Sequence, residues 1–150
     1  MDGDFGPSLS MIAWSRFIGP MHRQRPQGEL EQLLARVPDP DRRAAWRTAI
    51  FGDFAPGRLE ESHRRLQVGA GRLEQALARN PWIAGASFSI GDIVAFNMAS
   101  ALPRLFPEIA NPGATPRLLD WIAKTRERSG IRAALAMDRG ALRRAGRPPT

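Results

Sequence analysis

The sequence predicts an all-α fold, a helical bundle of six to seven helices, and three observations lead to that prediction. Apolar residues recur at helical spacing, and no segment alternates with the period of two that marks a half-buried strand. Proline and glycine divide the chain into segments of helical length. With 150 residues and 43% hydrophobic content, the chain can form one globular domain that buries about two-thirds of its unfolded surface.

The composition excludes several kinds of protein and site. The chain has no cysteine, which rules out disulfides, cysteine-ligated zinc and a thiol nucleophile. No apolar run approaches the roughly 20 residues of a membrane-spanning helix, and the acidic start is unlike a signal peptide. We therefore expect a cytoplasmic protein with no membrane partner.

The net charge of +7 is carried by arginine with a single lysine, Lys124. A basic excess can attract nucleic acid. No nucleic-acid-binding module accompanies the charge, so we do not expect a nucleic-acid partner and assign the charge to solvated helix faces.

The chain is expected to begin with a leader or linker remnant over residues 1–7, where glycine, aspartate and proline are concentrated. The helical domain is predicted over residues 8–137. Ser8 or Ser10 can cap its first helix. Gly19-Pro20 is expected to end that helix, because proline inside a helix removes a hydrogen bond.

Two short helices are predicted next. One covers residues 29–36 with leucines on one side. The other begins at Asp39-Pro40, which fit the N-cap and the first helical position. It is expected to end at Gly52.

The longest helix is predicted from about residue 56 to residue 79, with leucines on one face and arginine and glutamate on the other. Gly69 and Gly71 interrupt this pattern, each at a cost of about 1 kcal/mol relative to alanine. Two explanations are open. A neighbouring helix, such as the one expected to start at Ser89, approaches closely here, or the helix is kinked.

The stretch of residues 80–99 contains a strong helix-start pattern. Ser89 and Asp92 have the spacing of a capping box, in which each side chain bonds the backbone of the other residue. Phe88 and Ile93 occupy the two positions of a hydrophobic staple. The box favours charged Asp92, so we assign these four residues a structural role. The helix that follows is apolar on almost every side and is expected to be central and buried.

The remaining segments are a proline-broken loop over residues 103–114 and an amphipathic helix that starts at Thr115-Pro116. A short helix follows the boundary at Ser129-Gly130. Residues 138–150 are rich in arginine and poor in apolar side chains, and are expected to be a basic, disordered tail.

No pattern of catalytic residues or metal ligands stands out. His22 and His63 are the only histidines, and both are expected to be exposed to solvent. Two histidines without a His-x-x-x-His pair do not predict a metal site, and we expect none. The serines near Trp14 lack the glycine-flanked elbow of a nucleophile and are assigned to helix capping.

Several motifs follow one another in a characteristic order from residue 56 to residue 135. The long helix ends in L-E-Q-A-L-A-R-N, P-W-I-A-G and F-S-I-G-D-I-V-A-F follow, and a later helix begins P-R-L-L-D-W. Together they resemble the C-terminal helical domain of the glutathione S-transferase family. The family's capping box is matched by Ile83, Gly85, Ser89, Asp92 and Ile93. Its later helix and the turn after it are matched by Pro116, Leu118, Trp121, Arg128 and Ile131. Gly91 and Ser129 depart from the family's alanine and proline, both at helix ends.

This resemblance implies a pocket for a small hydrophobic ligand, because the first helix of such a domain lines the substrate cleft in the family. The candidate pocket residues are then Met11, Trp14, Ser15, Phe17, Ile18 and His22. Such an aromatic cleft is open to solvent or covered by a partner. The alternative is that Trp14 and Phe17 pack into the core.

Complete members of the family begin with a thioredoxin-like domain that binds glutathione and supplies the Tyr, Ser or Cys that activates the thiol. No part of residues 1–55 shows the strand pattern of that domain, and the chain has no tyrosine. We therefore assign no catalytic residue, and expect glutathione as a cofactor only if that domain is present. The partner is expected to be such a domain or a homodimer mate.

Two functions are open. The first is the substrate-pocket and subunit-contact half of a glutathione-transferase-like enzyme, inactive alone. The second is a free-standing binding or protein-interaction module without catalysis.

Overall fold

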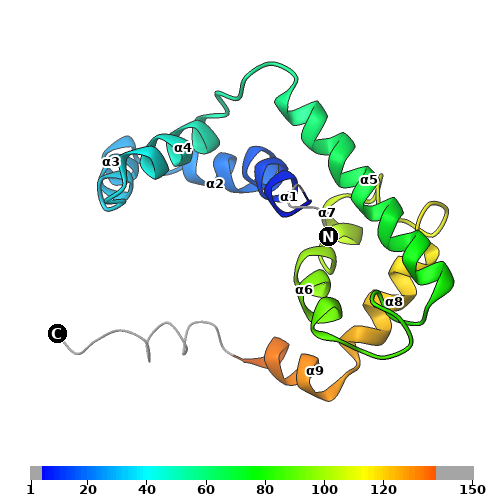
Figure 1. The fold of residues 1–150 in the computed structure, drawn as a ribbon. Helices are drawn as coiled ribbons and strands as arrows, with labels where there is room; N and C mark the ends of the chain where they lie inside the picture. Colours follow the sequence, from blue (N-terminus) through cyan, green and yellow to red (C-terminus); the bar gives the residue numbers. More distant parts are fainter. Residues whose placement is uncertain (1–4, 138–150) are drawn as a thin grey trace. The chain divides into compact units, whose positions relative to one another are not determined.

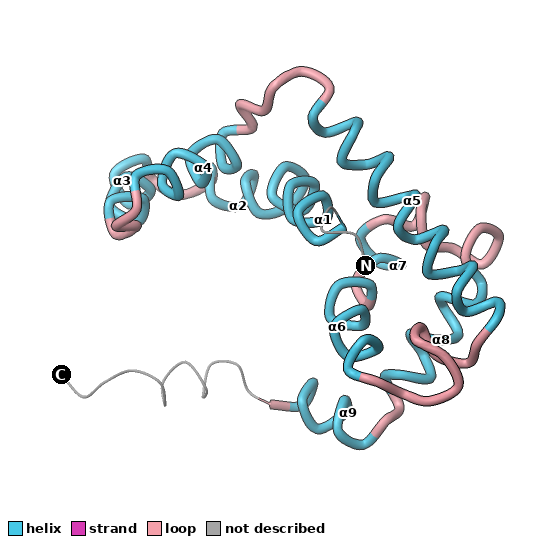
Figure 2. The backbone as a smooth tube through the Cα atoms, viewed as in Figure 1, coloured by secondary structure: helices cyan, strands magenta, loops and turns pink. Residues whose placement is uncertain are grey.

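The computed structural model describes residues 5–137, and this part of the chain is helical without a strand (Figures 1 and 2). The predicted all-α class is confirmed. In the described part of the chain, seven helices have eight residues or more: α1 Phe5–Ala13, α3 Gln27–Ala35, α4 Pro40–Phe51, α5 Arg58–Arg79, α6 Ile90–Ala99, α8 Pro116–Arg126 and α9 Ser129–Ala136. The chain divides after Arg72 into two compact units, which are described separately below.

The first helix begins earlier than predicted. Residues 5–7, expected to belong to the leader, form the first turn of α1, and Phe5 is buried with an exposed fraction of 5%. An aromatic ring that finds a packing partner outweighs the local preference of Gly6 and Pro7 for irregular structure, and a proline is tolerated in the first helical turn. Residues 1–4 and the predicted tail, residues 138–150, lie outside the described residues.

The first helix also ends later than predicted, because Gly19-Pro20 does not interrupt it. A π turn at Trp14–Ile18 follows α1, and α2, Gly19–Arg23, continues directly from that turn. The Gly19 N–H donates to the carbonyl five residues back, at Trp14. This wider turn accommodates the proline ring that would break a regular α-helix.

The close packing of α2 and α4 requires a glycine at position 19. A Cβ atom at this position would lie 2.8 Å from the Ala49 carbonyl oxygen and 3.0 Å from that of Ile50, so α4 approaches the α2 backbone closely. The Arg23 guanidinium donates to the same Ile50 carbonyl. These contacts tie the end of α4 to α2. Leu30, Leu34 and Ile50 form the core beneath them.

Helix α4 has the start and end that the sequence predicts. The Asp39 carboxylate accepts from the N–H groups of Asp41 at 2.9 Å and Arg42 at 3.2 Å, and Pro40 occupies the first turn. Gly52 ends the helix with φ of 81°, a conformation that suits glycine.

The long helix α5 runs without interruption through both glycines (Figure 1). A Cβ at Gly69 would lie 2.2 Å from the Phe5 ring, whereas a Cβ at Gly71 would meet nothing within 4 Å. The predicted close approach is therefore present at Gly69 only. Its partner is Phe5 of α1 rather than the helix that starts after Ser89, and no kink is needed.

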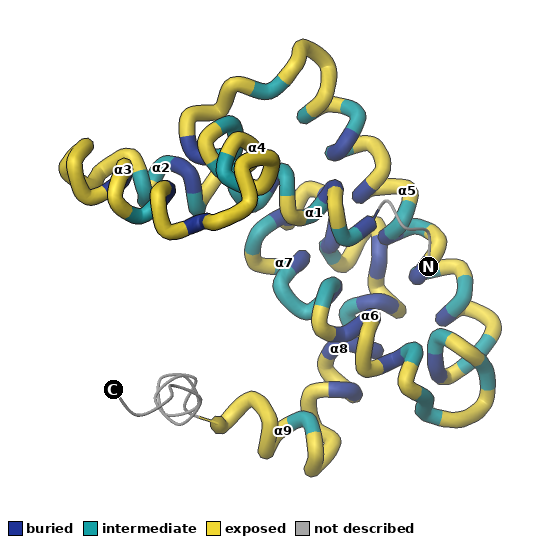
Figure 3. Tube along the Cα trace, turned by 60° about the vertical axis from the view of Figure 1, so that its left-hand side comes forward, coloured by how far each residue is buried: buried dark blue, intermediate teal, exposed yellow. Residues whose placement is uncertain are grey.

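In the second unit, α6 begins at the predicted capping box. The prediction that this helix is central and buried is wrong. Ala95, Phe96 and Ala99 are buried, but Ile90 is 73% exposed and Val94 is 45% exposed. Figure 3 shows both buried and exposed segments along α6.

Helix α8 is capped from a distance. The Thr115 side chain makes no cap bond, and the Glu74 carboxylate of α5 instead accepts from the N–H groups of Arg117 at 3.1 Å and Leu118 at 2.8 Å. A carboxylate at a helix N-terminus satisfies unpaired donors and complements the helix dipole. The predicted 103–114 loop starts with one helical turn, α7 Leu102–Leu105. Among residues 5–137, none of the helices has the length and apolarity needed to cross a membrane.

Candidate functional site

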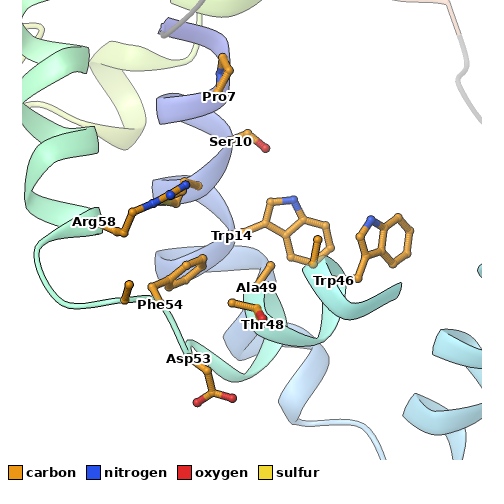
Figure 4. Close-up of a pocket in the computed structure, with 12 residues that line it drawn as sticks. Pro7, Ser10, Trp14, Trp46, Thr48, Ala49, Asp53, Phe54 and Arg58 are labelled. Atoms are coloured by element: carbon orange, nitrogen blue, oxygen red, sulfur yellow. The ribbon is translucent and has the colours of Figure 1, made fainter. Parts of the chain in front are cut away.

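A cavity of about 530 Å³ lies in the first unit, formed by α1, the π turn, α4 and the segment that leads into α5 (Figure 4). This volume is within the range of small-molecule sites in proteins. Within the part of the chain that the structure describes, every lining residue belongs to residues 7–58. They are Pro7, Ser10, Met11, Trp14, Ala45, Trp46, Thr48, Ala49, Asp53, Phe54, Ala55 and Arg58.

Two tryptophans form an aromatic wall of this cavity. The ring centroids of Trp14 and Trp46 are 5.7 Å apart with planes inclined by 44°. Both rings are half-buried and pack against the Leu30, Leu34 and Ile50 core. The π turn begins at Trp14, so the same backbone feature that admits the following proline also carries this ring. π turns are common at functional sites.

Of the six candidate pocket residues, Met11 and Trp14 line the cavity. The Met11 sulfur is 3.3 Å from the Ser62 hydroxyl, which donates to it. Ser15, Phe17 and Ile18 belong to the π turn but do not line the cavity. Phe17 is 43% exposed, so it is not a core residue in the described chain.

His22 does not line the cavity, yet it supports the wall. Its imidazole stacks on Trp14 with centroids 5.8 Å apart and planes inclined by 14°. The ring is half-buried, and its Nδ1 is buried without a hydrogen-bond partner in the described structure. The expectation that His22 is fully exposed is therefore wrong, because the π turn and α2 bring it back over Trp14.

The sequence did not predict the cavity residues of α4 and the segment after it. Trp46, Phe54 and Arg58 complete the wall, but no local pattern links them to Trp14. Trp46 was assigned only to a helix. The available signal was a large aromatic residue on an otherwise polar helix, which marks the side of that helix that packs on a neighbour.

Two charged side chains line the cavity. Arg58 is the first residue of α5, and Asp53 follows the end of α4. Within residues 5–137, neither side chain makes a hydrogen bond or ion pair, including with the other. In Figure 4, Arg58 extends towards α1 beside the Phe54 ring, and the Asp53 carboxylate points away from both tryptophans.

The second unit is organised around Asp92, which is fully buried. Its Oδ1 accepts from the Ile83 N–H and from the Trp121 indole N–H, both at 3.0 Å. Its Oδ2 accepts from the N–H and the hydroxyl of Ser89, both at 2.9 Å. Burial by itself raises the pKa of Asp92, but these four bonds outweigh burial and hold its pKa below the usual value. The carboxylate therefore stays charged and connects three segments: the loop over residues 80–89, α6 and α8.

The predicted staple residues lie at the edge of a second hollow of about 600 Å³, lined by Phe88, Ile93, Arg128, Ser129, Gly130, Ile131 and Ala134. The Arg128 guanidinium carbon lies 3.7 Å from the centroid of the Phe88 ring. Lys124 Nζ lies 3.9 Å from the Trp82 centroid, and Trp82 packs edge-on against Phe88 at 5.1 Å. These cations cover aromatic faces, and we assign the cluster to holding the loop before α6.

The cavity lining is mainly aromatic and apolar, with a few polar groups. Among the described residues it has aromatic rings, a thioether, two hydroxyls and two charges, without a histidine. Among residues 5–137, no three His, Asp or Glu side chains gather where they could hold a metal ion. The arrangement can bind an aromatic molecule against the Trp14 and Trp46 rings.

Comparison with known proteins agrees with the fold. Residues 41–138 match the family described as glutathione S-transferase, C-terminal domain. The protein LigF of Sphingobium sp. strain SYK-6 is 29% identical over 128 residues, which are 83% of this chain and 49% of LigF. The crystal structure of the beta-etherase LigF superposes with a TM-score of 0.77 at 28% identity, covering 87% of this chain and 55% of that one. The chain thus spans about half the length of the relative it matches.

Proposed function

Because this chain belongs to the glutathione S-transferase family through its C-terminal domain, we propose that it supplies the hydrophobic-substrate half of a glutathione-transferase-like protein. The observation that carries this proposal is the aromatic cavity. Met11 and Trp14 of the first helical run meet Trp46 of α4 around a space of about 530 Å³. An apolar pocket with a few polar groups is the usual form of a small-molecule site.

In this proposal a thioredoxin-like domain provides the glutathione site, either on the same polypeptide or on a second one. The chain has no tyrosine or cysteine, the described lining of its cavity holds no histidine, and the Asp53 carboxylate points away from both tryptophans (Figure 4). The chain alone is therefore not expected to conjugate glutathione. Because LigF is a beta-etherase and the cavity of this chain is lined by aromatic rings, an ether with an aromatic group is the first substrate class to test in the complete protein.

Two assays test this proposal. The isolated chain with glutathione and 1-chloro-2,4-dinitrobenzene should give no turnover above buffer. A chimera that joins the part of LigF outside the match to this chain should gain turnover, and Trp46→Leu in the chimera should raise KM for the hydrophobic substrate. Turnover by the isolated chain contradicts the proposal that another domain supplies the glutathione site. A chimera whose KM does not respond to Trp46→Leu contradicts the pocket assignment.

One observation favours a second candidate, a free-standing binding module. The twelve described residues that line the cavity come from residues 7–58, which supports a ligand held by this chain itself. This candidate predicts that the isolated chain binds an aromatic probe and that the chimera gains no turnover. The two candidates therefore differ in the result of the chimera assay.

A further inference from the structure

His22 contacts the aromatic wall of the cavity without lining the cavity itself. Its imidazole stacks on Trp14, with ring centroids 5.8 Å apart and planes inclined by 14°. Trp14 in turn packs on Trp46, with centroids 5.7 Å apart, and Figure 4 shows Trp14 reaching towards Trp46. Of these three rings, the two indoles line the cavity and the imidazole does not. A change at His22 therefore reaches the cavity through Trp14.

The stacked position of His22 suits the neutral imidazole. The ring is half-buried, and its Nδ1 is buried without a hydrogen-bond partner in the described structure. Protonation puts an N–H on both ring nitrogens, and a buried N–H without an acceptor destabilises the position that it occupies. The attraction of a cationic ring for the face of Trp14 is smaller than this cost. A charged His22 therefore has to turn towards water and leave the Trp14 ring.

The charges around His22 give a protonated ring no partner. On its own helix the Arg23 guanidinium donates to the Ile50 carbonyl, and Arg25 follows the end of α2. The charged residues of the elements packed on α2 are Arg16 of the π turn, Glu29 and Glu31 of α3, and Asp41, Arg42, Arg43 and Arg47 of α4. Among the described residues, no carboxylate forms an ion pair with His22, and Glu31 pairs with Arg47 at 2.7 Å instead. No carboxylate of this set therefore holds a charged imidazole in the stacked position.

We propose that His22 is a positioning residue whose protonation releases Trp14, so that the aromatic cavity binds its ligand less tightly as the pH falls. An ordinary histidine changes charge between about pH 5 and pH 8, which places this response in the physiological range. The effect on ligand affinity rests on the proposed function, whereas the response of the Trp14 ring does not. The two are therefore measured separately.

The first measurement follows the indole N–H signals of the ¹⁵N-labelled full chain between about pH 5 and pH 8. We expect the Trp14 signal to shift in one step, while those of Trp82 and Trp121 in the second unit stay in place. The chain has two histidines, so His63→Gln is the matched control for His22→Gln. The shift should persist in His63→Gln and disappear in His22→Gln. A Trp14 signal that does not respond to pH, or that responds equally in the two variants, overturns the proposal.

The second measurement is the affinity of the full chain for N-phenyl-1-naphthylamine, a neutral aromatic probe, over the same pH range. The affinity should fall about two- to ten-fold at the acid end, as expected for the loss of one aromatic pair. His22→Phe keeps a ring beside Trp14 but cannot take a proton, so it should bind tightly at every pH, whereas His22→Gln should bind weakly at every pH. An affinity that falls with pH in His22→Phe as in the wild type overturns the proposal. If the probe binds at no pH, the proposed pocket fails, and the Trp14 signal still decides whether His22 holds that ring.

Discussion

The Asp92 network yields a prediction whose size can be worked out from its hydrogen bonds. Asp92→Ala removes the acceptor of two backbone N–H groups, those of Ile83 and Ser89, and of the Trp121 indole N–H. A buried donor left without an acceptor costs about 1–3 kcal/mol. Trp121 is 2% exposed and bears that cost in full, whereas the two backbone groups are half-buried and regain part of it from water.

The expected loss for Asp92→Ala is therefore about 3–5 kcal/mol in the free energy of unfolding, a large part of the roughly 5–15 kcal/mol of a typical domain. Ser89→Ala removes one hydroxyl and leaves three donors on the carboxylate, so it should cost about 0.5–2 kcal/mol. Asp120→Ala, an exposed position on the same α8 as Trp121, should stay within about 0.5 kcal/mol.

Urea unfolding followed by circular dichroism at 222 nm measures all three variants, and the Trp121 indole N–H signal in NMR reports the lost bond directly. Faster solvent exchange of that N–H is expected in Asp92→Ala and not in Asp120→Ala. The reasoning is refuted if Asp92→Ala costs no more than Ser89→Ala. In that case the carboxylate caps a helix and does not join three segments.

Three further predictions concern stability. The folded-state pKa of Asp92 lies below its unfolded value of about 3.9, so its contribution to the free energy of unfolding is complete above that pH and is lost as the pH falls through the folded pKa. Urea unfolding at a series of acid pH values should show this loss, and Asp92→Asn should show a flatter pH dependence. A pH dependence that is the same in Asp92→Asn contradicts the assignment. Gly69→Ala should destabilise the protein by about 1–3 kcal/mol, because the new methyl group clashes with the Phe5 ring. Gly71→Ala lies in open space on the same helix and should stabilise the protein by up to about 1 kcal/mol. Equal effects of the two substitutions in thermal melts would argue against the close approach. Glu74→Ala should lower the free energy of unfolding by about 0.5–2 kcal/mol, because α8 loses its cap. Substitution of the exposed Glu60 by alanine is the control and should cost nothing measurable. If Glu74→Ala leaves the stability in urea unchanged, water replaces the cap.

The features that the sequence predicted well are local ones. Asp39-Pro40 and Gly52 bound α4 because a helix cap depends on residues within one turn. The same holds for Ser89 and Asp92, whose box lies within four residues. Family membership was also predicted, because these local patterns occur in a characteristic order, and the match over residues 41–138 confirms it.

The features that were missed depend on contacts between distant residues. Gly6 and Pro7 suggest irregular structure, but burial of Phe5 against Gly69 extends α1 to this end of the chain. Glu74 caps α8 from more than 40 residues away, which no window of sequence can indicate. Trp46 joins Trp14 for the same reason. Of the predicted pocket residues, Met11 and Trp14 line the cavity, whereas Ser15, Phe17 and Ile18 of the π turn and His22 of α2 do not.

The claim at the centre of this account is that the first unit binds an aromatic ligand against the rings of Trp14 and Trp46. The chain has four tryptophans, two in this cavity and two, Trp82 and Trp121, in the second unit. Titration of the ¹⁵N-labelled full chain with N-phenyl-1-naphthylamine therefore reports on both units at once. The account predicts that the indole N–H signals of Trp14 and Trp46 shift together while the other two stay in place. Shifts confined to Trp82 or Trp121, or no shift at saturating probe, contradict it.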